Sequence, residues 1–341
     1  MNGMYPMLAL ALSLLITFLL GYVVIPFMHK LKFGQTILDI GPNWHKNKQG
    51  TPTMGGFMFI LGTVLSVAVT LALGWALNNE SIRLAVADEY RFVALLAGIG
   101  LALLMALIGF MDDYIKVVQK RNLGLTARQK TVLQLAVAAS YLYTLYLGGM
   151  RTVWIPFFGG VSIVNGLGYL FWPIALLFIY GFTNAVNLTD GIDGLAASVT
   201  AVVALFFAFF SLRYDRFCLN TVTAAAFLGG CLGFLIWNRH PAKVFMGDTG
   251  SMFLGGMVVA LSFMIDRPIL LLLAGILYFG EAMSVTLQVM HYKRTKKRLF
   301  KMSPIHHHFE LSGWSENKIV VVFSLVTLVG CFLATALYFF A

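Results

Sequence analysis

Charged side chains are scarce in this sequence. Asp, Glu, Lys and Arg make up 11% of its 341 residues, whereas soluble globular chains contain about a quarter. Hydrophobic residues make up 59%, and the mean hydropathy is +0.83. These values exclude an ordinary soluble domain and predict an integral membrane protein. The apolar segments are long and continuous and lack the alternation of barrel strands, so we predict an all-α bundle.

Two further absences narrow the possibilities. The three cysteines (Cys218, Cys231, Cys331) lie in or beside apolar segments without metal-ligand spacing, so we interpret them as buried packing residues. The first 28 residues carry no charge, and Lys30 and Lys32 follow the first apolar run instead of preceding it. A cleaved signal peptide begins with basic residues. We therefore expect the first helix to be retained, with its N-terminus outside.

Ten apolar segments are long enough to span a membrane. They cover residues 5–28, 54–77, 91–111, 129–148, 169–187, 195–212, 220–237, 251–265, 268–290 and 318–340. With both termini outside, the inner side carries 18 of the 24 Lys and Arg residues, as the positive-inside rule requires. We therefore expect ten transmembrane helices, a cytoplasmic inner side and one domain over residues 1–341. The net charge of +10 reflects this topology, and we expect no nucleic-acid partner.

All the polar clusters that could take part in catalysis or binding fall on the predicted cytoplasmic side. These clusters are His45/Lys46/Lys48, Asp112/Asp113/Lys116, Asn187/Asp190/Asp193, Asn238/His240/Asp248 and His306/His307/His308. Hydropathy alone defines the spans, so the location of these clusters on one side is an independent observation. It predicts an active site at the boundary between the membrane and the cytoplasm.

The adjacent carboxylates Asp112 and Asp113 end the third span. They could be an interfacial pair that Lys116 neutralises one turn later. We favour a divalent-cation site that carboxylates from other helix ends complete. Adjacent helical residues point about 100° apart, so we expect only one of the two to face a shared site directly.

Two further segments offer oxygen ligands at this boundary. Asn187, Asp190 and Asp193 could form a polar helix cap and tight turn, but ligation of a cation or contacts to ribose and base would also use them. The loop before the eighth span brings Asp248 and a glycine-rich approach to a helix start, which favours phosphate. This loop lacks the Gly-Lys-Ser/Thr of a P-loop, so we reject that reading.

The internal run His306–His308 and the mid-span Glu281 need separate explanations. Three consecutive histidines do not easily converge on one zinc ion, and donors to phosphate or sugar oxygens fit better. A carboxylate at the depth of Glu281 requires a role or a buried partner. A helix–helix hydrogen bond and a contact to substrate both remain open.

Five motifs together resemble one family. They are Lys-Gln-Gly-Thr-Pro-Thr-Met-Gly-Gly (48–56), the Asp112-Asp113 pair, Asn-Leu-Thr-Asp-Gly-Ile-Asp-Gly (187–194), Phe-Met-Gly-Asp-Thr-Gly-Ser (245–251) and Ser-Pro-Ile-His-His-His-Phe-Glu (303–310). In order and over essentially the whole chain, they resemble the phospho-N-acetylmuramoyl-pentapeptide transferases, the MraY translocases. This family is a branch of the polyprenyl-phosphate sugar-1-phosphate transferases. The first and last motifs point to the muramoyl branch.

The resemblance implies an enzyme of the bacterial inner membrane whose active site faces the cytoplasm. Such an enzyme transfers phospho-N-acetylmuramoyl-pentapeptide from UDP-N-acetylmuramoyl-pentapeptide to undecaprenyl phosphate, and it releases lipid I and UMP for peptidoglycan synthesis. The resemblance also implies Mg²⁺, ten helices and a homodimer. The nearest alternative is a related transferase acting on another UDP-N-acetylhexosamine. A secondary transporter is the alternative from a different class.

The family motifs also imply roles for individual residues. Asp112, Asp113 and Asp248 are the expected catalytic residues and metal ligands, with Asp248 the preferred Mg²⁺ ligand and Asp112 the group that deprotonates or orients the lipid phosphate. The expected substrate contacts are Lys48, Lys116 and Lys130 to phosphate, Asn187, Asp190 and Asp193 on the uridine side, Phe245 stacked on uracil, Asn238 lining the pocket, and His306, His307 and His308 at the sugar–phosphate end. Direct attack and a two-step route through an aspartyl-phosphate both remain open.

Overall fold

The computed structural model describes residues 3–30, 48, 50–118 and 124–340. His45 and Lys46 of the first polar cluster lie outside the described residues. The helices are α1 (Met4–Lys30), α2 (Gly56–Ala76), α3 (Glu80–Ala87), α4 (Glu89–Val118), α5 (Ala127–Leu147), α6 (Phe171–Thr189), α7 (Leu195–Leu212), α8 (Cys218–Asn238), α9 (Gly247–Met264), α10 (Leu270–Ala274), α11 (Ile276–Thr295), α12 (Ile305–Glu310) and α13 (Glu316–Phe340). Two strands and two short 3-10 helices complete the described elements: β1 (Thr152–Ile155), β2 (Gly159–Ser162), η2 (Gly166–Leu170) and η3 (Asp215–Phe217).

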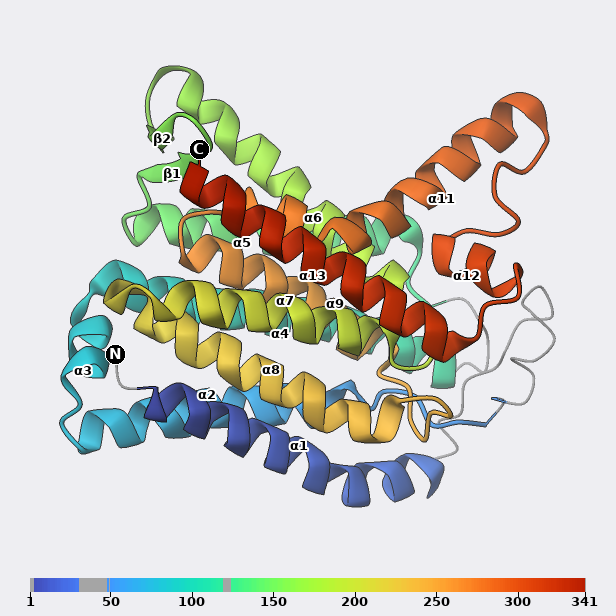
Figure 1. The fold of residues 1–341 in the computed structure, drawn as a ribbon, viewed down its shortest axis with the longest axis horizontal. Helices are drawn as coiled ribbons and strands as arrows, with labels where there is room; N and C mark the ends of the chain where they lie inside the picture. Colours follow the sequence, from blue (N-terminus) through green and yellow to red (C-terminus); the bar gives the residue numbers. More distant parts are fainter. Residues whose placement is uncertain (1–2, 31–47, 49, 119–123, 341) are drawn as a thin grey trace.

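The long helices run side by side, and the chain reverses direction from one to the next (Figure 1). Both termini lie at one end of the bundle, whereas α12 lies at the opposite end. This arrangement agrees with an even number of crossings. Within the described residues, eight helical segments are long and apolar enough to cross a membrane. They contain α1, α2, α4, α6, α7, α8, α9 and α13.

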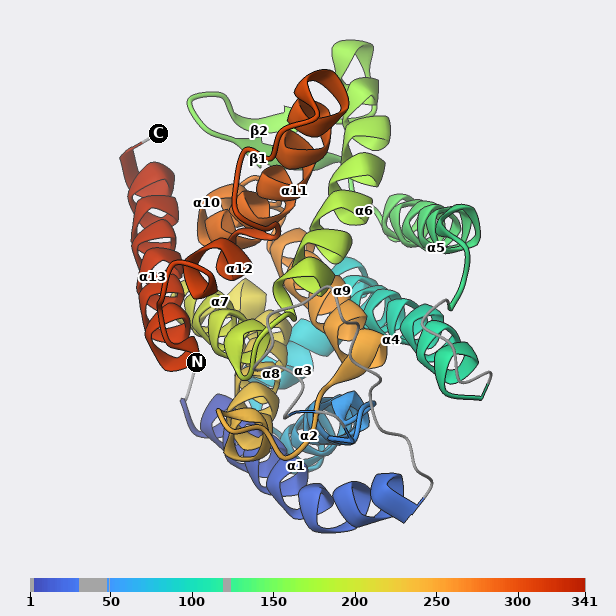
Figure 2. The same ribbon diagram turned by 90° about the vertical axis from the view of Figure 1, so that its right-hand side faces the viewer.

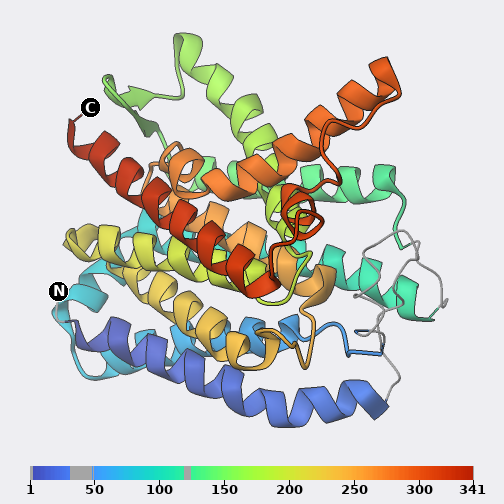
Figure 3. The ribbon, with the colours of Figure 1, turned by 45° about the vertical axis from the view of Figure 1, so that its right-hand side comes forward.

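The two remaining expected spans correspond to more polar helices. Residues 129–148 coincide with α5, which begins with basic and amide side chains. Residues 268–290 form two helices, α10 and α11, with a break around Gly275, and the α11 segment leans away from the bundle opposite α6 (Figure 3). The eight candidate spans support a helical membrane bundle, and the number ten stays a prediction.

Helix α9 is the innermost element of the bundle. Figure 2 shows it enclosed by neighbouring helices, and it packs against α2, α4, α6 and α7. Every side chain from Thr249 to Met264 is buried. Its N-terminal end therefore has a fixed place within the bundle, and the first turn carries Asp248.

The all-α prediction holds for the bundle but missed a small hairpin. Strands β1 and β2 pair antiparallel, with Thr152 opposite Ser162. The turn between them uses positive φ at Phe157 (66°) and Gly159 (68°). The hairpin lies at the end of the bundle that holds the termini, so it takes no part in the polar clusters at the other end.

Candidate active site

Three carboxylates and two lysines meet where α4 and α9 adjoin. One oxygen each from Asp112, Asp113 and Asp248 lies within 4.8 Å of the others. The ammonium groups of Lys116 and Lys130 lie 3.2 Å and 2.9 Å from Asp248 Oδ2. We call these five residues the carboxylate–lysine cluster. The structure thus brings together five of the residues predicted from sequence, although they come from three helices.

Asp113 caps helix α9 from the neighbouring helix. Its Oδ1 accepts the Asp248 N–H at 3.1 Å, and its Oδ2 accepts the Thr249 N–H at 2.9 Å and the Thr249 hydroxyl at 2.7 Å. The first N–H groups of a helix have no partner within that helix, and negative charge there is stabilising. Both oxygens of this buried carboxylate are therefore already engaged in fixing the start of α9.

A glycine explains how the two helix ends come so close. A Cβ atom at Gly109 of α4 would lie 2.1 Å from the Asp248 carbonyl oxygen, so no larger residue fits without displacing α9. The first turn of α9 rests on this position, one turn before Asp112 and Asp113. Because the α9 terminus sits over the end of α4, both neighbouring carboxylates reach it.

The expectation that only one of the adjacent carboxylates faces a shared site was therefore wrong. Both Asp112 and Asp113 are buried and contribute an oxygen to the cluster. Their partners differ, however. Asp112 accepts the Leu125 N–H at 2.8 Å and pairs with Lys116, whereas Asp113 binds the backbone of α9.

The charge of the cluster fits a divalent cation. Three carboxylates face two ammonium groups, so the negative groups outnumber the positive ones. Carboxylate oxygens are the ligands that Mg²⁺ prefers. The oxygens of Asp113 bind the start of α9, whereas those of Asp248 and Asp112 bind mostly lysine and asparagine side chains, so the latter two are the residues that would hold the ion. The side chain of Asp248 is the most exposed of the three, at 22%, compared with a buried Asp113.

The turn after α6 lies beside this cluster. Asn187 donates to Asp248 Oδ1 at 3.0 Å and to the Ser251 hydroxyl at 2.7 Å. Asp190 follows at the C-terminal cap of α6. Burial, and then the negative charges of Asp248, Asp113 and Asp193, raise the pKa of the Asp190 carboxyl to about 8. At neutral pH, Asp190 is therefore a mostly protonated group that can donate a hydrogen bond.

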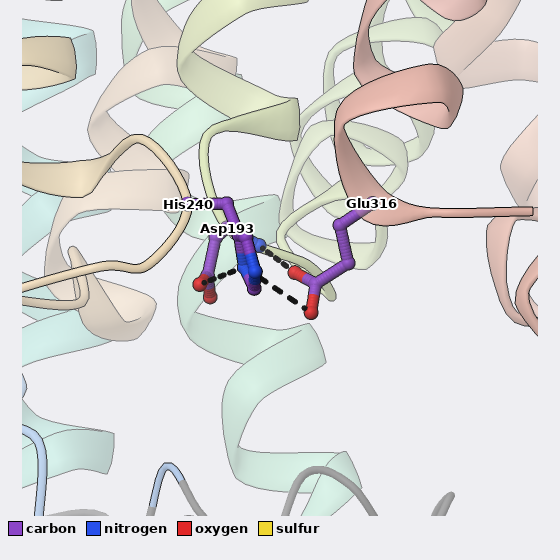
Figure 4. A group of neighbouring side chains, drawn as sticks. All are labelled: Asp193, His240 and Glu316. Carbon is purple, nitrogen blue, oxygen red and sulfur yellow. Dashed lines mark hydrogen bonds and ion pairs between the residues drawn. The ribbon is translucent and has the colours of Figure 1, made fainter.

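Lys48 lies in a second cluster at the same end of the bundle. Its ammonium is 2.8 Å from Asp193 Oδ1 and 2.7 Å from Glu316 Oε1. Asp193 Oδ2 also contacts His240 Nδ1 at 3.0 Å. Figure 4 shows Asp193, His240 and Glu316 converging from three segments. We call Lys48, Asp193, His240 and Glu316 the Glu316 cluster.

Sequence reasoning missed Glu316. It is the first residue of α13, which we expected to begin two residues later, at Lys318. Only its position directly before a long apolar run at the predicted cytoplasmic side could have drawn attention to it.

Asn238 and the 48–56 motif hold the loop before α9. Asn238 accepts the Gly194 N–H at 3.1 Å and donates to the Val244 carbonyl at 2.8 Å. Pro52 and Gly55 exchange backbone hydrogen bonds with Phe245, both at 2.8 Å. These contacts fix the half-buried Phe245 and the approach to Asp248.

The three histidines of α12 have three different partners. His306 Nδ1 lies 3.1 Å from Glu281 Oε1, and both side chains are fully buried. His307 Nδ1 lies 2.7 Å from Glu310 Oε2, and His308 Nδ1 accepts the Lys301 N–H at 3.1 Å. The buried partner expected for Glu281 is thus His306. The pair joins α11 to α12.

Comparison of the sequence with known proteins identifies the family to which this chain belongs. A model for "Glycosyl transferase family 4" matches residues 95–266. Proteins named phospho-N-acetylmuramoyl-pentapeptide-transferase are similar over most of their length: 43% identity for that of Caldicellulosiruptor bescii (97% of this chain, 96% of the relative) and 47% for that of Carboxydothermus hydrogenoformans (91% of each). The chain belongs to the phospho-N-acetylmuramoyl-pentapeptide-transferase family. The relative from Desulforamulus reducens is 46% identical over 95% of each chain. The resemblance inferred from the five motifs is therefore confirmed.

Proposed function

We propose that this protein transfers phospho-N-acetylmuramoyl-pentapeptide from UDP-N-acetylmuramoyl-pentapeptide to undecaprenyl phosphate, giving lipid I and UMP. Family membership supports the reaction. The observation that carries it to particular residues is the carboxylate–lysine cluster at one end of an apolar bundle. A lipid phosphate and a water-soluble nucleotide can meet only at such a boundary.

Asp248 and Asp112 are the proposed ligands of a catalytic Mg²⁺. The excess of carboxylates over ammonium groups supports this assignment. Apart from the Leu125 N–H, the partners of these two carboxylates are side chains, whereas Asp113 binds the backbone of α9. When bound, such an ion neutralises charge on phosphate oxygens and polarises the phosphorus. Asp113 serves the reaction by fixing the α9 turn that presents Asp248.

Lys116 and Lys130 are the proposed phosphate-binding cations. Two phosphate groups repel each other, so their approach needs positive charge around them. The two ammonium groups already lie within 3.2 Å of one Asp248 oxygen, and both side chains are partly open. Asp112 is the proposed group that accepts a proton from, or orients, the attacking lipid phosphate.

The turn between α6 and α7 is the proposed nucleotide side of the site. Asn187 lies against Asp248, and Asp190 at the C-terminal cap of α6 offers a carboxyl group to a ribose hydroxyl. Phe245 provides a half-buried aromatic face for uracil. Asp193 and Asn238 act by fixing the turn and the loop, because their polar atoms bind protein groups.

The α12 histidines are the proposed sugar–phosphate side. His307 and His308 are half-buried. The pairing of His306 with Glu281 fixes α12 against α11, which holds the next two imidazoles in place.

We also propose the full membrane arrangement. The active site faces the cytoplasm of a bacterial inner membrane, α5 and α10–α11 complete ten crossings, and both termini lie outside. Their common location at the end opposite α12 and the excess of Lys and Arg on the predicted inner side support this topology. The proposed homodimer follows from the family resemblance.

A purified-protein assay tests the reaction. UMP release is measured with undecaprenyl phosphate and each of two donors, the muramoyl-pentapeptide and N-acetylglucosamine derivatives of UDP. We expect release that depends on Mg²⁺ and on the muramoyl donor. Turnover of the N-acetylglucosamine donor alone would assign the chain to a related transferase. A transporter would release no UMP with either donor.

A further inference from the structure

Glu316 connects three segments that are distant in sequence. Its carboxylate accepts hydrogen bonds from the Lys48 ammonium at 2.7 and 2.8 Å and from the Asp193 N–H at 3.1 Å. His240 Nδ1 lies 3.5 Å from Glu316 Oε1. These partners come from the stretch before α2, the α6–α7 turn and the α8–α9 loop. Glu316 itself is 8% exposed.

A buried carboxylate is costly unless its partners satisfy it. A hydrophobic residue at the start of an apolar helix would avoid that cost entirely. Glu316 therefore has to be explained by what it holds, and what it holds is the edge of the proposed active site.

The Lys48 ammonium takes the place of a metal ion in this cluster. Oxygen and nitrogen atoms of Asp193, His240 and Glu316 lie within 4.8 Å of one another, which is a spacing that suits a cation. Lys48 already donates to both carboxylates at 2.7–2.8 Å. A metal ion would have to displace it. All three N–H bonds of Lys48 have a carboxylate oxygen to bind, so its charge organises protein groups.

The Asp193 carboxylate connects this cluster to the loop on the donor side of the proposed site. Its Oδ1 is held by Lys48, and its Oδ2 accepts the Ala242 N–H at 3.0 Å. Asp193 thereby joins the α6–α7 turn to the α8–α9 loop. Asp190 caps α6 at the start of the same turn, and Asn187 in the last turn of α6 donates to Asp248. Glu316 is therefore linked through Asp193 to the α6–α7 turn and to the α8–α9 loop.

We propose that Glu316 is a positioning residue for the nucleotide donor, acting through Lys48 and Asp193. The inference rests on the proposed function. Glu316 aligns the α6–α7 turn with the loop that carries Phe245, and it holds Lys48 at the edge of the site. Without the Glu316 charge, the α6–α7 turn and the loop that carries Phe245 are held less firmly, while the contacts within the carboxylate–lysine cluster remain.

The test compares Glu316→Gln with Glu89→Gln in the full-length enzyme. Glu89 is a matched control because it is also the first residue of a long helix, α4, and is exposed. We expect Glu316→Gln to raise the KM for the UDP donor about tenfold, the size expected for lost hydrogen bonds to a charged group. The KM for undecaprenyl phosphate should stay within about twofold, and the control should match wild type.

A double-mutant cycle with Lys48→Met separates positioning from a general packing defect. If Glu316 acts through Lys48, the effect of Glu316→Gln on donor KM falls to about twofold or less in the Lys48→Met background. Equal effects in both backgrounds, or an unchanged donor KM, would overturn the proposal. Glu316→Asp, which keeps the charge, should recover part of the donor KM and serves if the Gln variant does not fold. Failure of the proposed function is seen separately, as absence of UMP release by the wild-type enzyme.

Discussion

Replacing Asp113 by Asn tests whether this carboxylate acts through the fold or on the substrate. Asn has nearly the same shape but offers one acceptor oxygen in place of two. Asp113 accepts three hydrogen bonds from the first turn of α9. If the remaining oxygen keeps the Thr249 contacts, the new amide group faces the Asp248 N–H, so one donor meets another.

The cost can be estimated from these contacts. A lost hydrogen bond to a charged group costs about 1.5–3 kcal/mol, and the lost charge at a helix N-terminus costs a further ~0.5–1 kcal/mol. Relief of repulsion among the three carboxylates offsets part of that sum. We expect a net loss of about 2 kcal/mol, which for a chain of this size lowers Tm by about 3 °C. Activity should fall as well, because Asp248 is then less precisely held.

Thermal unfolding of the detergent-solubilised protein, followed by tryptophan fluorescence, measures the effect. Asp112→Asn is the matched control: its amide oxygen can still accept the Leu125 N–H, it loses only the pairing with the partly exposed Lys116, and it removes no α9 cap. We expect its Tm to stay within about 1 °C of wild type while UMP release is lost. If Asp113→Asn is inactive yet has the wild-type Tm, the capping role is refuted and Asp113 acts directly on metal or substrate.

The remaining predictions concern other parts of the site. Asp248→Asn should abolish UMP release and leave a folded, membrane-inserted protein, and EDTA should abolish wild-type release until Mg²⁺ is added back; normal activity in either case contradicts the metal assignment. The Asp190 carboxyl has a pKa of about 8 in the folded protein and an ordinary pKa of 3.8 in the unfolded chain. Between these two values only the folded protein holds the proton. The contribution of Asp190 to the free energy of unfolding therefore falls as pH rises towards about 8, and then levels off. In metal-free protein, the Tm of Asp190→Asn should therefore rise relative to the Tm of wild type between about pH 5 and pH 8. Parallel plots of Tm against pH for the two proteins would contradict the raised pKa. Gly56→Ala should lower the free energy of unfolding by about 1–3 kcal/mol, because its Cβ would lie 2.4 Å from Gly250 Cα, whereas Gly100→Ala, with open space around it, should be neutral in the same denaturation measurement.

Part of the site could be predicted because its chemistry is local in the sequence. Asp112, Asp113, Asp248 and Lys116 stand next to apolar runs, where a charge has few structural explanations. Counting spans predicts that they lie on one side of the membrane. The same counting cannot give side-chain partners, and Lys48, expected at phosphate, lies between Asp193 and Glu316.

Composition and motifs are enough to identify the class of molecule and the family. Hydropathy identifies a membrane protein, because long apolar runs are stable in a bilayer and not in water, and the five motifs identify the family. The partners of each polar group depend on how distant segments pack against one another. Helix α9 begins at Gly247, four residues before the expected start, because a carboxylate from α4 caps it. Glu281 likewise has a partner from another helix, His306. The role of a buried polar group depends on its partner, and in both cases that partner comes from a distant part of the chain.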